Sequence, residues 1–175
     1  MNYLTKKHIH IYIFYGSQTG YAESVAQELK KQIVRKVKPI QLDIDILNNF
    51  FDYDISNQPG DSFTIILLST TGDGEFPDNA EQFFKRLRKQ KPDLHTTQYC
   101  LLGFGDSNYN SFCHSSKVLL RMLKRLGATT FIDTKYNDDS INSTEMIDTW
   151  MERVIEYLSN YKHSVWDWFI HSMTD

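Results

Sequence analysis

A turn with the composition of a phosphate-binding loop lies near the start of the chain, in the segment Gly16-Ser17-Gln18-Thr19-Gly20-Tyr21-Ala22-Glu23. The segment joins an apolar run of strand length to a helical pattern, so its backbone N–H groups would meet an anion at the positive end of a helix. It has neither the Gly-Lys-Ser/Thr ending of a Walker A loop nor the spacing of the dinucleotide fingerprint. Because it contains no Lys or Arg, it predicts a monophosphate held by amides and by the hydroxyls of Ser17 and Thr19. Taken alone, it is also typical of an ordinary glycine-containing turn with a Ser or Thr cap.

A second unusual loop follows a buried strand and reads Ser69-Thr70-Thr71-Gly72-Asp73-Gly74-Glu75-Phe76-Pro77-Asp78. A simple strand-to-helix connection does not need two glycines and a proline, which are residues typical of tight turns. We expect a flat ring to lie against Thr71-Gly72, where a backbone carbonyl could accept a hydrogen bond from a ring nitrogen. Asp78 is expected to cap the next helix in a capping box with Glu81. That ordinary role leaves Gly72-Asp73-Gly74 unexplained.

The third loop, Gly103-Phe104-Gly105-Asp106-Ser107-Asn108-Tyr109-Asn110-Ser111-Phe112, carries an aromatic side chain among small polar residues. Tyr109 could stack on a planar ligand, although a tyrosine that packs in the hydrophobic core would give the same sequence pattern. The three loops come from strands that neighbour each other in the predicted sheet. Together, a phosphate cradle, an aromatic plate and a glycine-rich edge predict a site for a mononucleotide with a large flat base.

The elements that must position these loops alternate between strand and helix patterns. Phe63 opens an apolar run typical of a central strand that is buried on both faces. Helical stripes follow the first, third and fourth strands, and a last helix is expected from about Thr144. The pattern predicts an α/β three-layer sandwich with a five-stranded parallel sheet of order 2-1-3-4-5 and helices on both faces. Ligands of such sheets bind beyond the carboxyl ends of the strands, here beside the first and third. The strands are expected at residues 9–15, 40–46, 63–68, 99–104 and 129–132, and a loop at residues 48–61.

Length and composition indicate the number of domains, the absence of a membrane span and the state of the cysteines. With 175 residues, 41% of them hydrophobic, the chain fits one domain. We expect that domain at residues 1–160, with a C-terminal tail or the start of a linker at 161–175. The aromatic segment Trp166-Asp167-Trp168-Phe169 could begin a linker, mark a truncation, or form a docking strand. No apolar run of membrane or signal-peptide type is present, so a cytoplasmic protein without a membrane span is expected. Cys100 and Cys113 are accordingly expected to be reduced.

The net charge is small, but the charged residues are unevenly distributed along the chain. A net charge of −3 and a pI near 6.1 disfavour a nucleic-acid partner. Basic residues crowd the predicted helices, whereas acids such as Asp73, Asp106 and Asp139 gather in the loops. An acidic rim would lower the potential of a redox group beside it and attract a basic partner. A solvated rim without any partner is the plainer alternative.

With the three loops in view, the chain resembles the FMN-binding, flavodoxin-like domains of the diflavin reductase family over residues 9–158. The stretches SQTGYAE, STTGDGEFPDNA and LLGFGDSNYNSF resemble that family's phosphate loop and its second and third flavin loops. Thr71 stands where several members carry a second stacking tyrosine, which predicts a more open ring face. Together with Phe112-Cys113 and Asp133-Thr134, it makes the chain most similar to the methionine synthase reductase group.

The resemblance implies FMN as cofactor, with no catalytic side chain and no metal. Tyr109 would stack on one ring face, Thr70, Thr71 and Gly72 would line the other, and Asp139 would lie near the ring edge and ribityl chain. The implied FMN-binding residues are Ser17, Gln18, Thr19, Gly20, Tyr21, Ala22, Ser69, Thr70, Thr71, Gly72, Asp73, Gly74, Phe104, Gly105, Asp106, Asn108, Tyr109, Phe112, Cys113 and Asp139.

The implied function is electron relay in an oxidoreductase. An FAD/NADPH-binding reductase domain, absent from this sequence, would supply electrons, and a protein acceptor with a basic docking surface would receive them. Cobalamin-dependent methionine synthase is one candidate acceptor. Alternatives are a free-standing flavodoxin-type carrier, the FMN domain of a cytochrome reductase or other diflavin reductase, and a flavin-free interaction scaffold. A response-regulator-like module is disfavoured because Tyr15-Gly16-Ser17 stands where its clustered acids would be.

Overall fold

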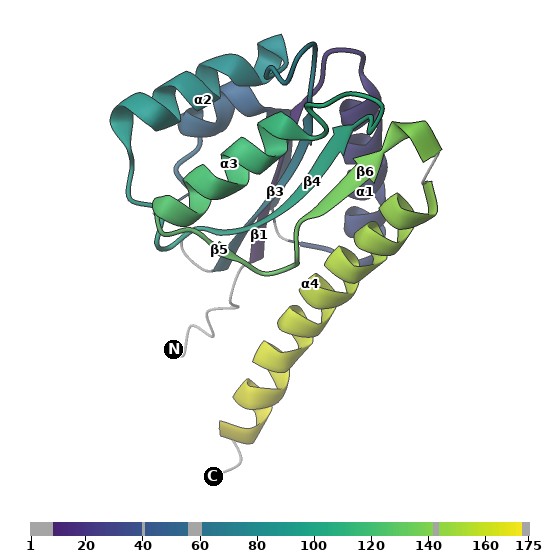
Figure 1. Ribbon diagram of the computed structural model, residues 1–175. Coiled ribbons are helices and arrows are strands. Elements are labelled where there is room, and N and C mark those ends of the chain that lie inside the picture. Colours follow the sequence, from purple (N-terminus) through teal and green to yellow (C-terminus); the bar gives the residue numbers. More distant parts are fainter. Residues whose placement is uncertain (1–8, 40, 56–60, 142–143, 173–175) are drawn as a thin grey trace.

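The computed structural model describes residues 9–39, 41–55, 61–141 and 144–172, with side chains described as far as residue 161. In this part of the chain, one parallel sheet of order β2-β1-β3-β4-β5, with β6 also paired to β4, lies between two helical layers (Figure 1). The predicted strand order and the α/β sandwich are therefore confirmed.

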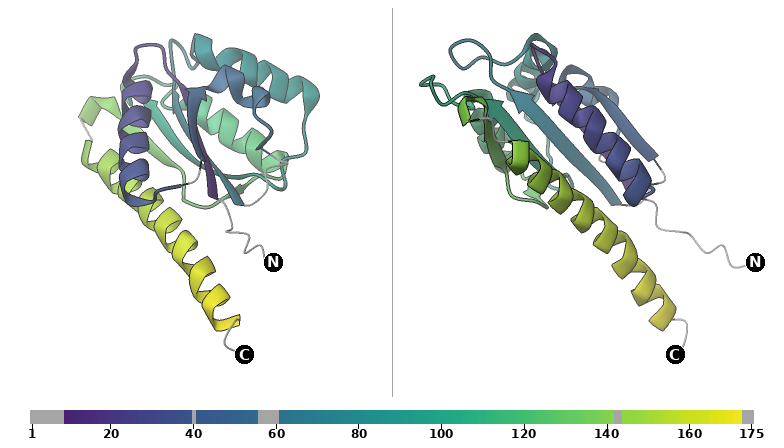
Figure 2. Two further views of the ribbon diagram at one scale, coloured as in Figure 1. Left: turned by 180° about the vertical axis from the view of Figure 1, so that it is seen from behind. Right: turned by 90° about the vertical axis from the view of Figure 1, so that its right-hand side faces the viewer.

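The central strands are buried because helices cover both faces of the sheet. β1 (Ile9–Gly16), β3 (Asp61–Ser69) and β4 (Gln98–Gly105) pair in parallel, and β2 (Gln41–Ile46) forms an edge. α1 (Tyr21–Lys36) and α4 (Thr144–Ser172) cover one face (Figure 2). α2 (Asp78–Gln90) and α3 (His114–Arg125) cover the other. Each face thus has its own hydrophobic core, and the strand ends that carry the three loops are held firmly.

The fifth strand is divided into two pieces. β5 (Thr129–Thr130) pairs with the start of β4, and β6 (Lys135–Asp138) pairs with its end, both in parallel. The sequence predicted only a strand at residues 129–132 and assigned the acidic stretch after it to a loop. The second piece was missed because Lys135, Asn137 and Asp138 give it no apolar run. Its consequence is that Asp138 stands at a strand end, beside Gly105.

Two local expectations were wrong. The segment 48–61, expected to be a loop, starts within a 3-10 helix, η1 (Leu47–Asp52), while residues 56–60 lie outside the described part. Asp78 is not a helix cap. It is the first residue of α2, and the residue at the N-cap position, Pro77, makes no side-chain capping hydrogen bond. The carboxylate of Asp78 instead accepts a hydrogen bond from Gln18.

The last helix continues past the expected domain boundary. α4 runs without a break from Thr144 to Ser172, and its final turns extend beyond the sheet (Figure 1). Residues 166–169 are therefore helical, and the docking strand considered for them is wrong. The boundary at residue 160 stays a prediction. Among the described helices, none is both long and apolar enough to cross a bilayer.

Candidate functional site

The three loops lie together at the carboxyl ends of β1, β3 and β4. Hydrogen bonds join each loop to its neighbours. The Ser17 N–H donates to Asn79 Oδ1 at 2.9 Å, and the Thr70 N–H donates to the Phe104 carbonyl at 3.0 Å. The three loops therefore form one continuous surface, which lies at the sheet position where the strand order reverses.

The first loop has the donors that a phosphate needs. Gly20 has a φ of 90°, and its N–H donates to Ser17 Oγ at 3.0 Å, so the Ser17 hydroxyl keeps its own proton to donate. No side chain caps α1, so the N–H groups of its first turn have no helical acceptor. Thr19 adds an exposed hydroxyl. Uncapped amides with two hydroxyls at a helix N-terminus fit a phosphate monoester.

Tight packing fixes the position of this loop. A Cβ on Gly16 would lie 2.6 Å from Leu68 Cδ1 and 2.7 Å from the Ala80 methyl group, so only glycine fits here. The Gln18 side chain donates to Asp78 Oδ2 and accepts from the Asp78 N–H, both at 3.1 Å. Gln18 was predicted to bind phosphate, but its amide is occupied by this clasp. The prediction that Gln18 contacts a phosphate therefore depends mainly on its backbone N–H.

The second loop is a tight hairpin rather than an irregular connection. Thr71 and Glu75 pair as an antiparallel bridge, with the Thr71 N–H donating to the Glu75 carbonyl at 3.0 Å. The Thr71 carbonyl accepts from the N–H groups of both Gly74 and Glu75, at 3.1 and 2.8 Å. It is therefore not free for a ligand. Within the described residues the Gly72 carbonyl has no hydrogen-bond donor, and Gly72 adopts a left-handed φ of 48°.

Side chains of α3 anchor the second loop, and the sequence analysis missed them. Ser115 Oγ lies 2.7 Å from Thr70 Oγ1 and donates to the Ser69 carbonyl at 3.0 Å. Ser116 Oγ donates to the Leu68 carbonyl at 2.9 Å. Two buried serines in a first helical turn directly after a ligand loop were the signal available in the sequence. Their role depends on contacts across more than forty residues, which spacing does not reveal.

The third loop presents Tyr109 and buries its neighbours. Tyr109 is 65% exposed, so one ring face is open to a planar ligand. Phe104 is buried and meets the ring of Tyr21 edge-on at 5.5 Å, which places it beneath the surface rather than on it. The Ser111 hydroxyl donates to the Asp73 carbonyl at 2.8 Å and ties this loop to the second.

Cys113 is a packing residue in this arrangement. It is buried, has a left-handed φ of 51°, and its N would lie 2.7 Å from a Cβ on Gly105. Burial raises the pKa of its thiol to about 12, and Asp139 and Asp138 add to that rise against the opposing effect of Lys117. The thiol is therefore protonated at neutral pH and poorly reactive. Both cysteines are free, as expected for reduced thiols, and both are buried.

The end of β6 completes the site with an acidic corner. The Asp138 carboxylate accepts from the N–H groups of Ser107 and Ser140, at 3.0 and 3.1 Å. Hydrogen bonds from the side chain and N–H of Ser107, and then from those of Ser140, lower the pKa of Asp138 to about 2 against the opposing effect of burial. For Asp139, burial raises the pKa, and Asp106 and Asp138 add to it while the Asn137 amide opposes it. Asp138, absent from the predicted site residues, thus holds the third loop in place while Asp139 lies in a crowded negative field.

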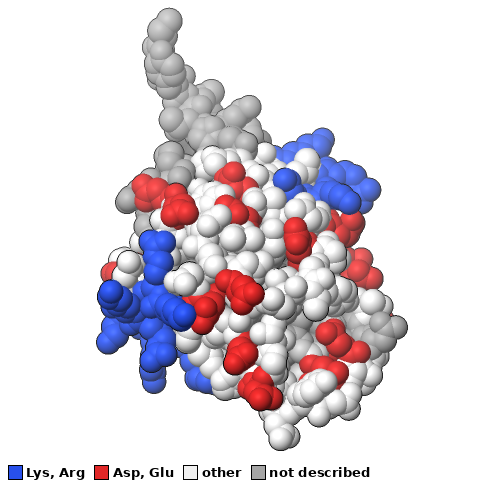
Figure 3. All heavy atoms as spheres, turned by 90° about the horizontal axis from the view of Figure 1, so that it is seen from above, with Lys and Arg blue, Asp and Glu red and all other residues white. Residues whose placement is uncertain are grey.

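The acids are spread across the face that carries the loops. In the view onto this end of the molecule, Asp and Glu side chains occupy much of the centre, whereas Lys and Arg gather at the edge (Figure 3). This agrees with the electrical polarity expected from the sequence. In the part of the chain that is described, no group of His, Cys, Asp and Glu side chains could hold a metal ion.

We compared the chain with protein families and with known proteins. The flavodoxin family model matches residues 13–150. The chain is 33% identical over 132 residues to pyruvate dehydrogenase [NADP(+)], mitochondrial, of Euglena gracilis, and covers 7% of that protein with 74% of its own length. It is 31% identical over 156 residues to mouse methionine synthase reductase, covering 22% of that protein with 87% of its own length.

A solved structure shows the same fold. A cysteine-to-serine mutant of flavodoxin from Pseudomonas aeruginosa superimposes with a TM-score of 0.70 at 25% identity. The match covers 85% of this chain and 98% of that one. The chain therefore spans a whole flavodoxin structure but less than a quarter of the two curated relatives named above.

Proposed function

The chain belongs to the flavodoxin family, whose cofactor is FMN, and we propose that it is the FMN-binding electron-transfer module of an NADPH-dependent diflavin reductase. The observation that supports this most is the hydrogen-bonded union of the three loops at the strand ends. It offers a phosphate cradle, an exposed aromatic ring and the Gly72 carbonyl on a single surface. Each of these fits a different part of FMN.

The chain's own residues would bind, orient and tune the cofactor. Bound FMN supplies the redox chemistry, so no acid, base or nucleophile is required from the protein. The uncapped amides of α1 with Ser17 and Thr19 would hold the phosphate, and Tyr109 would cover one ring face. The Gly72 carbonyl would accept a hydrogen bond from a ring nitrogen. Asp106, Asp138 and Asp139 would oppose added negative charge and lower the reduction potential.

The acidic charge of the loop face and the names of the relatives suggest the electron donor and the electron acceptor. Electrons would come from an FAD/NADPH-binding domain, as expected for a diflavin reductase, and pass to an acceptor whose basic surface meets the acidic face. Methionine synthase is the acceptor suggested by the relative named methionine synthase reductase. The expected cytoplasmic location belongs to the same proposal, although another relative carries "mitochondrial" in its name.

A free-standing flavodoxin is the second candidate, since the match covers 98% of a flavodoxin chain. The two roles differ in the source of electrons. For a reductase module, the longer reading frame that contains it should encode an FAD-binding domain. A frame that ends without one would favour the free carrier.

Electron transfer to a basic acceptor tests the role of the acidic face. The protein, loaded with FMN and reduced, is mixed with a basic haem protein such as cytochrome c at increasing salt concentration. We expect the rate to fall as ionic strength rises, because salt screens the attraction between the two surfaces. A rate independent of salt would contradict charge-guided docking, while FMN binding itself would be unaffected.

A further inference from the structure

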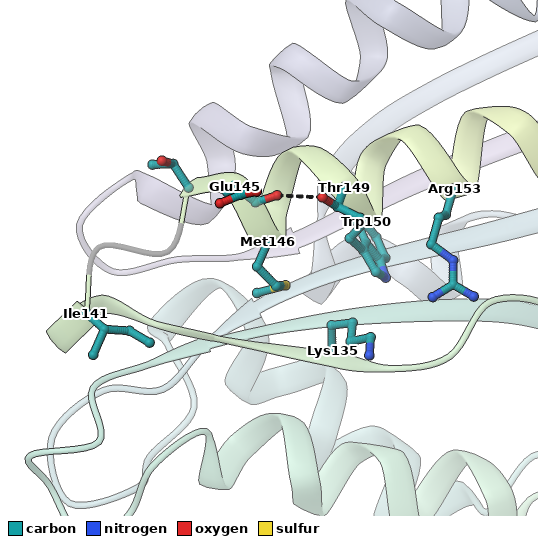
Figure 4. Close-up of a pocket in the computed structure, with 8 residues that line it drawn as sticks. Lys135, Ile141, Glu145, Met146, Thr149, Trp150 and Arg153 are labelled. Atoms are coloured by element: carbon teal, nitrogen blue, oxygen red, sulfur yellow. Dashed lines mark hydrogen bonds between the residues drawn. The ribbon is translucent and has the colours of Figure 1, made fainter.

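A cavity of about 640 Å³ lies between β6 and the first half of α4, outside the three loops (Figure 4). Its walls come from the edge strand of the sheet on one side and from one face of a helix on the other. Met146, Trp150 and Arg153 follow each other on α4 at helical spacing, so they project toward the same side. Lys135 faces them from β6.

The walls combine apolar surface with unpaired positive charge. Met146 and Trp150 form the apolar part, and Figure 4 shows their side chains pointing from α4 toward β6. Lys135 and Arg153 are both exposed, and within the described residues neither has an ion-pair or hydrogen-bond partner. The cavity has one acidic side chain, that of Glu145. Its balance of charge is thus positive on a molecule whose net charge is −3.

Trp150 adds a second indication of a ligand. Its side chain is 2% exposed, and its indole Nε1–H has no acceptor among the described residues. A buried N–H without an acceptor has lost its hydrogen bond to water and gained none in return, so most such groups in proteins are paired. An acceptor oxygen brought in against this ring would supply the missing hydrogen bond.

We propose that this cavity binds a small organic carboxylate. Its charged group would lie between Lys135 and Arg153 and accept a hydrogen bond from the Trp150 Nε1–H, and its apolar body would lie against Met146. The volume lies in the range of about 300–1,000 Å³ that is usual for small-molecule sites. An arginine can bind a carboxylate with two parallel hydrogen bonds, and a lysine adds a second charge. An inorganic anion would leave the apolar wall unused. This inference does not depend on the FMN role, since none of its residues belongs to the three loops.

Benzoate is a suitable probe, because it combines a carboxylate with a flat apolar body. It is titrated into the ¹⁵N-labelled protein with FMN present, and the Nε1–H signal of Trp150 is followed by NMR. Trp150→Phe assigns that signal. We expect a saturable shift for benzoate and none for the uncharged benzyl alcohol. Lys135→Gln with Arg153→Gln should weaken binding at least tenfold, and Lys124→Gln on α3, an exposed lysine away from the cavity, should not change it.

Three results would each overturn the proposal. One is the absence of a saturable shift of the Trp150 signal. Another is an equal shift with benzyl alcohol, which would show an apolar groove without charge recognition. The third is unchanged benzoate affinity in the double variant, which would remove Lys135 and Arg153 from the site.

Discussion

Single residues divide the proposed site into a phosphate end and a ring end. At the phosphate end the loop has no cation, so hydroxyls and amides must carry the binding. At the ring end Tyr109 is the side chain most exposed for stacking. The two ends can be tested separately because riboflavin has the ring but lacks the phosphate.

Thr19→Val removes a hydroxyl of the phosphate end without changing the shape of the side chain much. We expect FMN binding to weaken by roughly tenfold to a hundredfold, since a hydrogen bond to a charged group contributes about 1.5–3 kcal/mol. Riboflavin binding should change little. Fluorescence titration with both flavins measures this, and equal losses would contradict a phosphate contact.

Tyr109→Ala removes the expected stacking partner at the ring end. An aromatic pair contributes about 0.5–1.5 kcal/mol beyond the surface that it buries, so both FMN and riboflavin should bind more weakly. Flavin fluorescence should also be less quenched on binding. Tyr109→Phe keeps the ring and serves as the control. Unchanged affinity in the alanine variant would show that the ring lies elsewhere.

Residue types predicted the backbone conformation of the loops well where a glycine is required. Gly20 and Gly72 adopt the left-handed conformation that their loops require, and both stood out in the sequence. Ser115 and Asp138 were missed because their work is to hold distant loops, through hydrogen bonds to Thr70 and Ser107. Gln18 was predicted to bind phosphate, and its side chain is instead held by Asp78. Local pattern carries no signal for such tertiary contacts.

At the scale of elements, the phosphate loop depends on how closely β1 approaches α2. Gly16→Ala should destabilise the fold by about 1–3 kcal/mol, because the new methyl group has to displace Leu68 and Ala80. Gly20→Ala is a matched comparison, since no atom lies within 4 Å of its Cβ position but its φ is 90°. Conformational strain alone should cost about 1–2 kcal/mol there. Urea unfolding of both variants gives the values, and a Gly16→Ala protein as stable as the wild type would contradict the packing.

Elements around the site also make stability sensitive to alkaline pH. Burial, followed by its hydrogen bond to Asp45, raises the pKa of Tyr53 from 10.0 to about 12, and burial raises that of Cys113 from 9.0 to about 12. Above the ordinary pKa values of 10.0 for Tyr53 and 9.0 for Cys113, the unfolded chain releases these protons. The folded chain keeps them until the pH approaches about 12. The free energy of unfolding should therefore fall as pH rises from 9.0 toward about 12.

The contribution of one residue can be isolated. Tyr53→Phe removes one of these protons and should make the decline less steep above pH 10.0. Each such proton contributes a slope of at most about 1.4 kcal/mol per pH unit. Denaturant unfolding at a series of pH values measures it. Identical slopes for the variant and the wild type would contradict the difference assigned to Tyr53.

The order and type of the main elements followed from hydrophobic periodicity, but their ends and small pieces did not. The buried run opened by Phe63 could only be a central strand, and Ile147, Trp150 and Val154 marked the inner face of α4 correctly. β6 was missed because its pairing with β4, rather than its own composition, makes it a strand. The aromatic segment at residues 166–169 is part of helix α4, so the strand considered for it does not form.

At the scale of the whole molecule, two separate surfaces would receive two kinds of partner: the acidic face that carries the three loops (Figure 3) and the cavity beside α4. The acidic face fits the exchange of electrons with a basic protein, and the cavity beside α4 fits a small carboxylate. Sequence alone predicted the first surface from the placement of its charges. It could not predict the second, because Lys135 and Arg153 come together only through the packing of β6 against α4.

Titration of the purified chain with FMN, followed by flavin fluorescence and visible absorption, decides whether the three loops bind this cofactor. We predict one FMN bound per chain, with quenched fluorescence and a flavin spectrum that stays with the protein through gel filtration. A chain that binds no FMN saturably would contradict the account, because every role assigned to the three loops depends on that cofactor.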